Sequence, residues 1–327
     1  MGPPWPRGYR LVMFDEAITT VVNHSGFAMP SEVHEWPGIR LLECDRAGDI
    51  PPDIAGEVVF TRTDGGPNLG ELLSRGAKWV HTLGTGVDGF PFEVIDGQIL
   101  TCSRGISGEM IGEWVFAQML AVAKAVRDGP LSEPPESWNA PVPGITSVRG
   151  KTVVIFGIGG IGAEVARLSL ALDMRVIGVR RRGTEAPYPG MEVVNDLAAV
   201  IGEADHLVIA APSTPETRHL FNDDMLARVK PGVHVVNIAR GTLVDQEALR
   251  RALADDRVAV ASLDVCDPEP LPAGHWLYDH PKVFLTPHTS WAGPGAFAQI
   301  ISTFRDNYLR YRAGEPLEGL VDIEAGY

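Results

Sequence analysis

The sequence predicts an α/β fold of two domains, each built around a parallel sheet. Three observations lead to this fold class. The chain has 327 residues, which is the length of about two domains of ordinary size. Short apolar runs with strand character alternate with helical patterns along most of the chain. Near the middle, the run V-V-I-F-G-I-G-G-I-G, which begins at Val153, places spaced glycines between a strand and a helix.

The first domain comes before these glycines. Strands are expected at residues 10–14, 39–43, 58–60 and 79–82, with a short helix at 69–75. Loops that contain Pro and Gly separate these segments. Such alternation is typical of a Rossmann-like or flavodoxin-like domain.

A helix and an extended arm connect the two domains. The pattern at residues 107–126 is helical and apolar on more than one face, so we expect a buried helix that crosses between the domains. Residues 128–150 are rich in Pro, Ser and Gly, which indicates an extended arm. Trp138 in this arm requires an apolar partner, and a second subunit is one candidate.

The second domain begins at the strand before the glycines. Its further strands are expected at residues 174–179, 192–194, 206–210, 233–238, 258–263 and 283–286. Its helices are expected at 163–172, 197–201, 223–229 and 245–255. Asp223 and Asp245 are the expected caps of the last two helices. This alternation is that of a doubly wound sheet.

The last helical pattern, at residues 295–311, is expected to return to the first domain. We therefore assign residues 1–106 and 295–327 to a substrate-binding domain. Residues 107–294 form a dinucleotide-binding domain, which includes the connecting helix and the arm.

The G-x-G-x-x-G spacing predicts where a dinucleotide would bind. Gly157 permits a tight turn, Gly159 lets a pyrophosphate approach the backbone, and Gly162 lets the helix and strand pack closely. The N–H groups at the start of the helix, at Gly160 and Ile161, would hold the phosphates. The alternative interpretation is a tight turn that binds no ligand.

Three arginines follow the second strand of this domain. A NAD-binding domain has an acidic residue at this point, which binds the ribose 2′-hydroxyl. Here Arg180 takes that place and is followed by Arg181 and Arg182. Arginine binds a phosphate through charge-assisted hydrogen bonds, so the run favours NADP, with NAD as the alternative cofactor. The other interpretation is a solvated basic turn.

Three further polar residues follow later strands, at the edge where doubly wound sheets place their ligands. Arg240 lies in N-I-A-R-G, Glu269 in D-V-C-D-P-E-P and His288 in L-T-P-H-T-S-W. Arg240 could bind a substrate carboxylate and polarise the adjacent carbonyl, while His288 donates a proton to the carbonyl oxygen. Glu269 would orient the imidazole and stabilise its protonated form. Taken singly, each residue also has an ordinary structural interpretation.

Charge and composition argue against several classes of partner. The net charge of -14 and the pI of about 5.1 argue against a nucleic acid or an anionic membrane as the main partner. The N-terminus has no apolar signal-peptide segment, and no apolar run reaches the length of a membrane span. Cys44, Cys102 and Cys266 lack the spacing of a zinc site or a disulfide framework, and we interpret them as small buried apolar residues. These features indicate a cytoplasmic protein.

Taken together, the motifs resemble those of the D-2-hydroxyacid dehydrogenases. The resemblance runs from about residue 79 to 291 and rests on G-I-G-G-I-G, A-P-S-T-P-E-T-R-H-L-F, V-V-N-I-A-R-G-T-L-V-D, D-V-C-D-P-E-P and L-T-P-H-T-S-W. It implies that Arg240, Glu269 and His288 are the catalytic trio. It further implies a homodimer built through the dinucleotide-binding domains, to which the arm would contribute.

The same resemblance implies roles for residues outside the trio. Backbone N–H groups of the loop L-G-T-G-V-D would bind the substrate carboxylate, and the residues concerned are Gly84, Thr85 and Gly86. Asp264 would contact the nicotinamide carboxamide. The remaining cofactor contacts implied are Pro212, Thr217, Ile238 and Ala239.

The chain departs from the common family pattern at two places. Residues 112–114 read G-E-W, where the family commonly has A-E-H, and Arg180 replaces the usual acid. The arginine resembles the NADP-linked glyoxylate and hydroxypyruvate reductases, which implies reduction of small 2-oxoacids to D-2-hydroxyacids without a metal. Trp291, three residues after His288, either walls the pocket against long substrates or packs in the core.

Two other functions are considered. Formate dehydrogenase is a relative, but it should have Gln beside the histidine, so Glu269 argues against it. A nucleotide-sensing corepressor on the same fold could keep the cofactor site and even the trio. Another 2-hydroxyacid dehydrogenase specificity also remains open.

Overall fold

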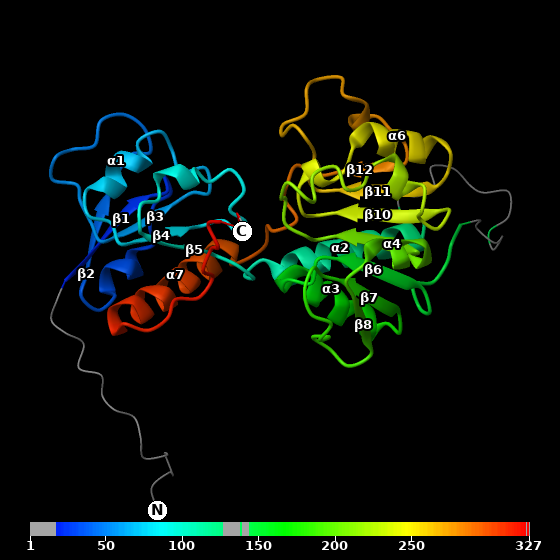
Figure 1. The fold of residues 1–327 in the computed structure, drawn as a ribbon, viewed down its shortest axis with the longest axis horizontal. Coiled ribbons are helices and arrows are strands. Elements are labelled where there is room, and N and C mark those ends of the chain that lie inside the picture. Colours follow the sequence, from blue (N-terminus) through cyan, green and yellow to red (C-terminus); the bar gives the residue numbers. More distant parts are fainter. Residues whose placement is uncertain (1–17, 127–137, 139–143, 325, 327) are drawn as a thin grey trace, which may run out of the picture. The chain divides into compact units, whose positions relative to one another are not determined.

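The computed structural model describes residues 18–126, 138, 144–324 and 326. The predicted strand at 10–14 and most of the predicted arm at 128–150 lie outside these residues. The described chain divides into two compact units: one runs up to Arg104 and resumes at Phe297, and the other is Gly105–Ala296 (Figure 1). Each unit has a parallel sheet with helices, so the predicted fold class is confirmed.

The first unit contains a five-stranded parallel sheet in the order β2-β1-β3-β4-β5. Its strands are β1 (Thr19–His24), β2 (Ile39–Glu43), β3 (Val58–Thr61), β4 (Trp79–Thr82) and β5 (Ile99–Cys102). Its helices are α1 (Leu69–Ser74), nearly all of α7 (Ala296–Ala313), and the 3-10 helices Ser31–Glu35 and Phe92–Val94.

Two strands of this sheet, β1 and β5, are missing from the sequence prediction. β1 lies between β2 and β3 and ends in Asn23 and His24. Because these two residues are polar, the segment does not have the continuous apolar pattern expected of a central strand. Both side chains are buried and have partners: the Asn23 amide donates to Glu43 at 2.6 Å, and the His24 Nδ1 lies 3.0 Å from the Thr61 hydroxyl. β5 has only four residues and directly follows a turn.

The C-terminal helix α7 packs on this first sheet, as predicted. Phe304 is fully buried, and its ring centroid lies 4.7 Å from that of Phe60 and 5.4 Å from that of Trp79. The Tyr308 hydroxyl donates a hydrogen bond to the Pro37 carbonyl at 2.9 Å. The end of the chain therefore completes the core of the unit that the chain builds first.

The second unit contains a seven-stranded parallel sheet in the order β12-β11-β10-β9-β6-β7-β8. Its strands are β6 (Thr152–Phe156), β7 (Arg175–Val179), β8 (Met191–Val194), β9 (His206–Ile209), β10 (Val233–Asn237), β11 (Val258–Leu263) and β12 (Val283–Leu285). Its helices are α2 (Gly108–Ala123), α3 (Gly160–Ala171), α4 (Leu197–Val200), α5 (Asp223–Leu226), α6 (Gln246–Ala254), and the 3-10 helices Ile201–Glu203, Gly241–Leu243 and Trp276–Tyr278. The chain runs outward from β6 to β8 and then returns to β9, so the strand order reverses between β6 and β9. Such a reversal is where doubly wound sheets bind ligands.

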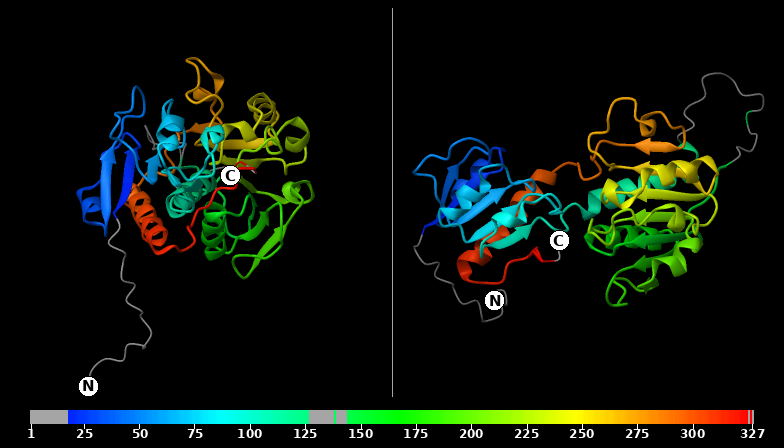
Figure 2. Two further views of the ribbon diagram at one scale, coloured as in Figure 1. Left: turned by 60° about the vertical axis from the view of Figure 1, so that its left-hand side comes forward. Right: turned by 45° about the horizontal axis from the view of Figure 1, so that its top comes forward.

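Helices cover both faces of this second sheet (Figure 2). Alternate residues of β6 point to opposite faces: Val154 joins the core under α4, α5 and α6, whereas Val153 and Ile155 join the core with α2 and α3. All three side chains are fully buried. A strand buried on both faces reads as a continuous apolar run, which is why β6 is easily identified in the sequence.

One of the two predicted helix caps is wrong. The cap of α5 is Asn222, whose side chain accepts a hydrogen bond from the Met225 N–H, while Asp223 is the first helical residue. Asp223 instead forms an ion pair with Arg251 at 2.7 Å. The predicted cap of α6 is confirmed, since Asp245 accepts hydrogen bonds from the first turn of that helix. Adjacent polar residues can each cap a helix, so the sequence did not distinguish Asn222 from Asp223.

The expectation that the helix at 107–126 is buried all round is wrong for the described chain. Ile111, Val115 and Met119 are buried at helical spacing, but Trp114 and Phe116 are half-exposed. The buried face packs against α3, and the rest of the helix has less cover. Like every other helix in the described residues, α2 is too short or too polar to cross a bilayer.

Candidate active site

The glycine turn after β6 allows two close backbone approaches. A Cβ atom at Gly157, whose φ is +102°, would lie 2.5 Å from the Ala211 nitrogen. A Cβ atom at Gly162 would lie 2.0 Å from the Gly157 carbonyl oxygen. Both distances are far below contact distance, so the first and third glycines are required by the chain itself.

The middle glycine leaves open space at the start of α3. A Cβ atom at Gly159 would meet nothing within 4 Å among the described residues. Gly159 is the N-terminal cap, and no described side chain caps the helix there. The first N–H groups of a helix bind anions when no side chain satisfies them. The residues present therefore fit a dinucleotide pyrophosphate, with Gly160 and Ile161 supplying N–H groups.

The three arginines form a turn directly after β7, and a residue absent from the sequence prediction shapes it. The Asn195 amide donates to the Arg180 carbonyl at 2.8 Å and to the Gly183 carbonyl at 3.0 Å. Arg180 is half-exposed, and Arg181 and Arg182 are exposed. Asn195 therefore holds both ends of the turn while the guanidinium groups remain accessible. An amide that bonds only to backbone leaves no pattern in the sequence, so the prediction missed it.

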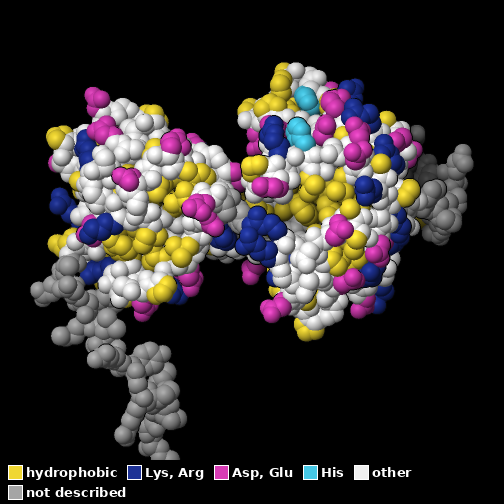
Figure 3. All heavy atoms as spheres, viewed as in Figure 1, with side chains coloured by type: hydrophobic (Ala, Val, Ile, Leu, Met, Phe, Trp, Pro, Cys, Tyr) yellow, Lys and Arg dark blue, Asp and Glu magenta, His cyan; other side chains and the backbone are white. Residues whose placement is uncertain are grey.

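The loop after β9 lies beside the glycine turn, because Ala211 packs on Gly157. Its conformation is held by Thr217, whose hydroxyl donates to the Pro212 carbonyl at 2.8 Å. Glu216 in this loop has its pKa lowered chiefly by the Thr214 hydroxyl and further by the positive charge of Arg181. The loop and the basic turn are therefore near each other. Acidic and basic side chains are interspersed over the face shown in Figure 3, where several basic ones gather in dark blue.

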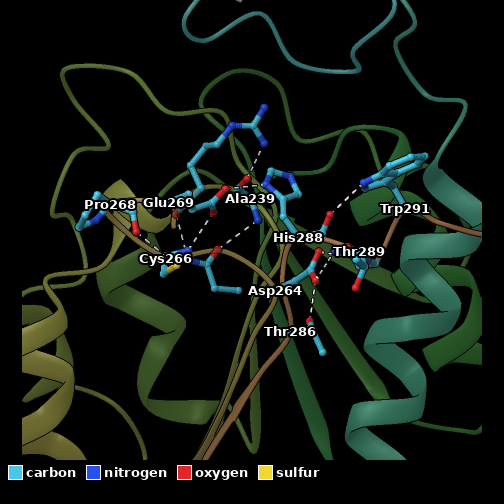
Figure 4. A network of polar contacts seen from close by, with 12 residues as sticks. Ala239, Asp264, Cys266, Pro268, Glu269, Thr286, His288, Thr289 and Trp291 are labelled. Carbon is cyan, nitrogen blue, oxygen red and sulfur yellow. Dashed lines mark hydrogen bonds and ion pairs between the residues drawn. The ribbon is translucent and has the colours of Figure 1, made fainter. Parts of the chain in front are cut away.

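The members of the predicted trio follow the carboxyl ends of three neighbouring strands. Figure 4 shows Glu269 and His288 pointing toward each other. Arg240 follows β10, Glu269 follows β11 and His288 follows β12. The His288 Nδ1 lies 2.8 Å from a carboxylate oxygen of Glu269. Both side chains are partly accessible, with exposed fractions of 40% and 36%.

The Glu269 carboxylate is held at both of its oxygens. One oxygen is bonded to His288, and the other accepts a hydrogen bond from the Cys266 N–H at 3.0 Å. Partial burial by itself raises the pKa of Glu269, but these two hydrogen bonds outweigh it and the charge of Arg240 adds to them. The pKa of Glu269 therefore lies below its ordinary value, and the group is an anion at neutral pH.

Asp264 organises the loop that carries His288. This aspartate is buried, and its carboxylate accepts hydrogen bonds from the Thr286 hydroxyl at 2.5 Å and from the N–H groups of Thr289 at 2.8 Å and Ser290 at 2.9 Å. The His288 N–H donates to the Asp264 carbonyl at 2.9 Å. His288 has a φ of +54°, a conformation that these bonds fix. Asp264 thus has a structural function that the sequence prediction missed.

Trp291 contacts the same loop. Its indole Nε1 donates to the His288 carbonyl at 2.9 Å, and the residue is 43% exposed (Figure 4). The alternative interpretation of Trp291 as a core residue is therefore wrong.

Comparisons with known proteins show which family the chain belongs to. The family model for the NAD-binding domain of D-isomer-specific 2-hydroxyacid dehydrogenases matches residues 116–290, more than half of the chain. The chain belongs to this family. It is therefore an oxidoreductase whose cofactor is a nicotinamide dinucleotide, and the predictions of family and cofactor are confirmed.

Individual family members match most of the chain. It is similar to a glyoxylate reductase of Thermofilum pendens, with 30% identity over 94% of each chain. A family member from Xanthobacter autotrophicus, solved with NADPH and MES, has a TM-score of 0.80 and 26% identity over 95% of this chain and 100% of its own. An NADPH-dependent glyoxylate/hydroxypyruvate reductase from Sinorhizobium meliloti, solved with NADP and sulfate, has a TM-score of 0.76 and 26% identity over 94% of this chain and 100% of its own.

The predicted carboxylate-binding loop, residues 84–86, belongs to the other unit. Its carbonyl groups are engaged within that unit: the Gly84 carbonyl accepts from the Ser103 N–H at 3.0 Å, and the Thr85 carbonyl from the Cys102 thiol at 3.5 Å. A Cβ atom at Gly84 would lie 2.1 Å from the Thr63 hydroxyl. The loop's contact with a substrate next to His288 stays a prediction.

The cysteine next to the trio is not suited to catalysis. Burial, together with the charges of Glu269 and Asp267, raises the pKa of Cys266 to about 11. The thiolate is the reactive form of cysteine, so Cys266 is inert at neutral pH. Cys44 and Cys102 are buried free thiols, in keeping with their interpretation as small apolar residues, whereas Cys266 is only half-buried and does not fit that interpretation.

Proposed function

We propose that the protein reduces small 2-oxoacids, with glyoxylate and hydroxypyruvate as leading candidates, to D-2-hydroxyacids with NADPH. The observation that carries this proposal is the 2.8 Å contact between the His288 Nδ1 and a Glu269 carboxylate that also lies in the field of Arg240. A histidine paired to an anion, with an arginine near enough to act on that anion, can supply the proton donor and the cation that reduction of a 2-oxoacid uses.

The residues of the trio would divide the chemistry as follows. Arg240 binds the substrate carboxylate through charge-assisted hydrogen bonds and polarises the adjacent carbonyl. The bound nicotinamide supplies a hydride to the carbonyl carbon. Because Glu269 holds the Nδ1 of His288, the other ring nitrogen, Nε2, is the atom that gives a proton to the carbonyl oxygen. Glu269 keeps the ring in that orientation and stabilises the charged form that donates.

Cofactor preference in this proposal rests on the basic turn. Arg180, Arg181 and Arg182 stand where a NAD-specific enzyme has an acid, and Asn195 holds the turn in shape. Similar proteins solved with NADPH or NADP support the preference. The other proposed cofactor contacts are Gly157, Gly159, Gly160, Ile161, Gly162, Pro212, Thr217, Ile238, Ala239 and Asp264.

We assign to Trp291 the role of limiting the size of the substrate. Its indole is half-exposed and fixed by its bond to the His288 carbonyl, so a long side chain on the substrate would meet a rigid wall. We assign the carboxylate-binding N–H groups to Gly84, Thr85 and Gly86, with the first unit as the substrate-binding domain and the second as the dinucleotide-binding domain.

We further propose that the protein is a cytoplasmic homodimer. Trp138 lies within the predicted arm and is 77% exposed. Tryptophan is enriched at protein–protein interfaces, so a second subunit would cover this indole. The three free cysteines are compatible with a reducing compartment. Light scattering of the purified chain would test the dimer, and a monomer at micromolar concentration would contradict it.

The proposed reaction is tested by following reduced-nicotinamide absorbance with glyoxylate, hydroxypyruvate, pyruvate and phenylpyruvate, each with NADPH and with NADH. Fast oxidation of NADPH by glyoxylate or hydroxypyruvate, with slow turnover of phenylpyruvate, is the expected result. Binding of NADPH without turnover of any 2-oxoacid would contradict the proposal and favour a nucleotide-sensing protein. Formate, tested with NADP and NAD, should not react.

A further inference from the structure

The loop that carries Glu269 is tethered by a side chain on another element. Gln246 is the first residue of α6, and its amide nitrogen donates to the Asp267 carbonyl at 2.6 Å. In return, the Asp267 N–H donates to the amide oxygen of Gln246 at 3.3 Å. A single side chain thus pairs with both backbone groups of one residue, as a neighbouring strand would.

A second contact holds the same loop one residue earlier. A Cβ atom at Gly241 would lie 1.9 Å from the Cys266 carbonyl carbon and 2.1 Å from its oxygen. The segment from Gly241 to Gln246 therefore contacts this loop twice. The backbone at Gly241 packs on the backbone of Cys266, and the side chain of Gln246 forms hydrogen bonds with the backbone of Asp267. Directly before these two anchors in the chain lies the Cys266 N–H, which donates a hydrogen bond to the Glu269 carboxylate at 3.0 Å.

Anchoring of this kind matters because the tip of the loop lies outside the core. Pro268, Glu269 and Pro270 are all exposed, so core packing does not fix their positions. The orientation of Glu269 depends on its bonds to Cys266 and His288, and the position of Cys266 depends on its neighbours. A misplacement of about 1 Å among reacting groups can cost about a hundredfold in rate.

We propose that Gln246 is a positioning residue for the Glu269–His288 pair. It touches neither cofactor nor substrate in this scheme and acts by fixing the Asp267 backbone. The proposal rests on the proposed function for its kinetic consequences. Among the described residues, the other charged groups near the pair include Arg240, which acts on Glu269, and Asp264, whose carboxylate accepts hydrogen bonds from the two residues after His288. Asp267 is also near, and its carboxylate lies 4.0 Å from Arg218.

The test replaces Gln246 by Met, which keeps the length of the side chain but removes both hydrogen bonds. We expect kcat with glyoxylate and NADPH to fall about tenfold, which is less than the roughly hundredfold loss for a 1 Å misplacement because the other contacts of the loop remain. The KM for NADPH should stay within twofold, because Gln246 acts on the pair that would transfer the proton and not on the cofactor site. The control is Glu247→Met on the exposed next residue of α6, with unchanged kcat.

Gln246→Glu is the second variant. It keeps the acceptor for the Asp267 N–H but cannot donate to the Asp267 carbonyl, and a negative charge suits the first turn of a helix. The variant should therefore fold even if Gln246→Met does not. We expect its kcat to fall as well, with Tm close to that of the unchanged protein.

A measurement without turnover separates this proposal from the proposed function. The Nδ1–H proton of His288, which is hydrogen-bonded to Glu269, is followed by proton NMR at one fixed pH, with His288→Asn identifying its low-field signal. Gln246→Met should move this signal upfield or broaden it away, whereas Glu247→Met should leave it unchanged. An unchanged signal in a folded Gln246→Met protein would overturn the positioning role, whatever the enzyme reduces. Inactivity of the unchanged protein toward every 2-oxoacid would overturn the proposed function alone.

Discussion

Replacing Arg180 by Asp should reverse much of the proposed preference for NADPH. Two unit charges about 4 Å apart interact by about 1 kcal/mol in water. A 2′-phosphate carries nearly two negative charges, and the substitution changes the side-chain charge by two units, which gives about 4 kcal/mol before screening. Arg180 is half-exposed, so salt screens roughly half of this. The remaining 2 kcal/mol or so corresponds to about a 30-fold fall in the NADPH-to-NADH ratio of kcat/KM.

The assay is steady-state reduction of glyoxylate with each cofactor at fixed ionic strength. Because Asn195 bonds only to backbone carbonyls of the turn, Arg181 and Arg182 should stay in place in the variant. Arg228→Asp, which makes the same change at another exposed position, is the control and should leave the ratio unchanged. A ratio that is unaltered in Arg180→Asp would refute the assignment of selectivity to Arg180.

Three further outcomes are expected. Arg240→Ala should lower kcat/KM at least a hundredfold, since carboxylate binding and carbonyl polarisation both depend on the guanidinium; near-normal kinetics would contradict its role. His288→Asn should abolish reduction yet still bind NADPH with the affinity of the unchanged protein in a fluorescence titration, and loss of cofactor binding would instead indicate a structural residue. Burial lowers the pKa of His206 to about 4, so the unfolded chain takes up a proton below pH 6.5 and folding stability should drop by up to about 3 kcal/mol as the pH falls from 6.5 to 4. In urea unfolding, the free energy of unfolding of His206→Gln should depend less steeply on pH. If it depends on pH as steeply as that of the unchanged protein, the assignment to His206 is contradicted.

The parts of the site that the sequence predicted are those where chemistry restricts the residue type. A close backbone approach requires Gly162, and an imidazole and a carboxylate such as His288 and Glu269 pair readily when the fold brings them together. The strands of the second sheet were equally easy to predict from the sequence, because strands buried on both faces are apolar throughout.

The parts that the sequence did not reveal depend on contacts with backbone or on partners distant in the chain. Asn195 and Gln246 act through carbonyl and N–H groups that any sequence supplies, so nothing distinguishes them from ordinary surface amides. β1 was missed because Asn23 and His24 are paired only after the sheet has formed. The cap of α5 was misplaced by one residue, since Asn222 and Asp223 are both good caps.

The hydrogen bond from Trp291 to the His288 carbonyl has a consequence for engineering. A variant that widens the pocket by shortening this side chain also removes a support of the proton donor, so broader substrate range and slower turnover should arise together.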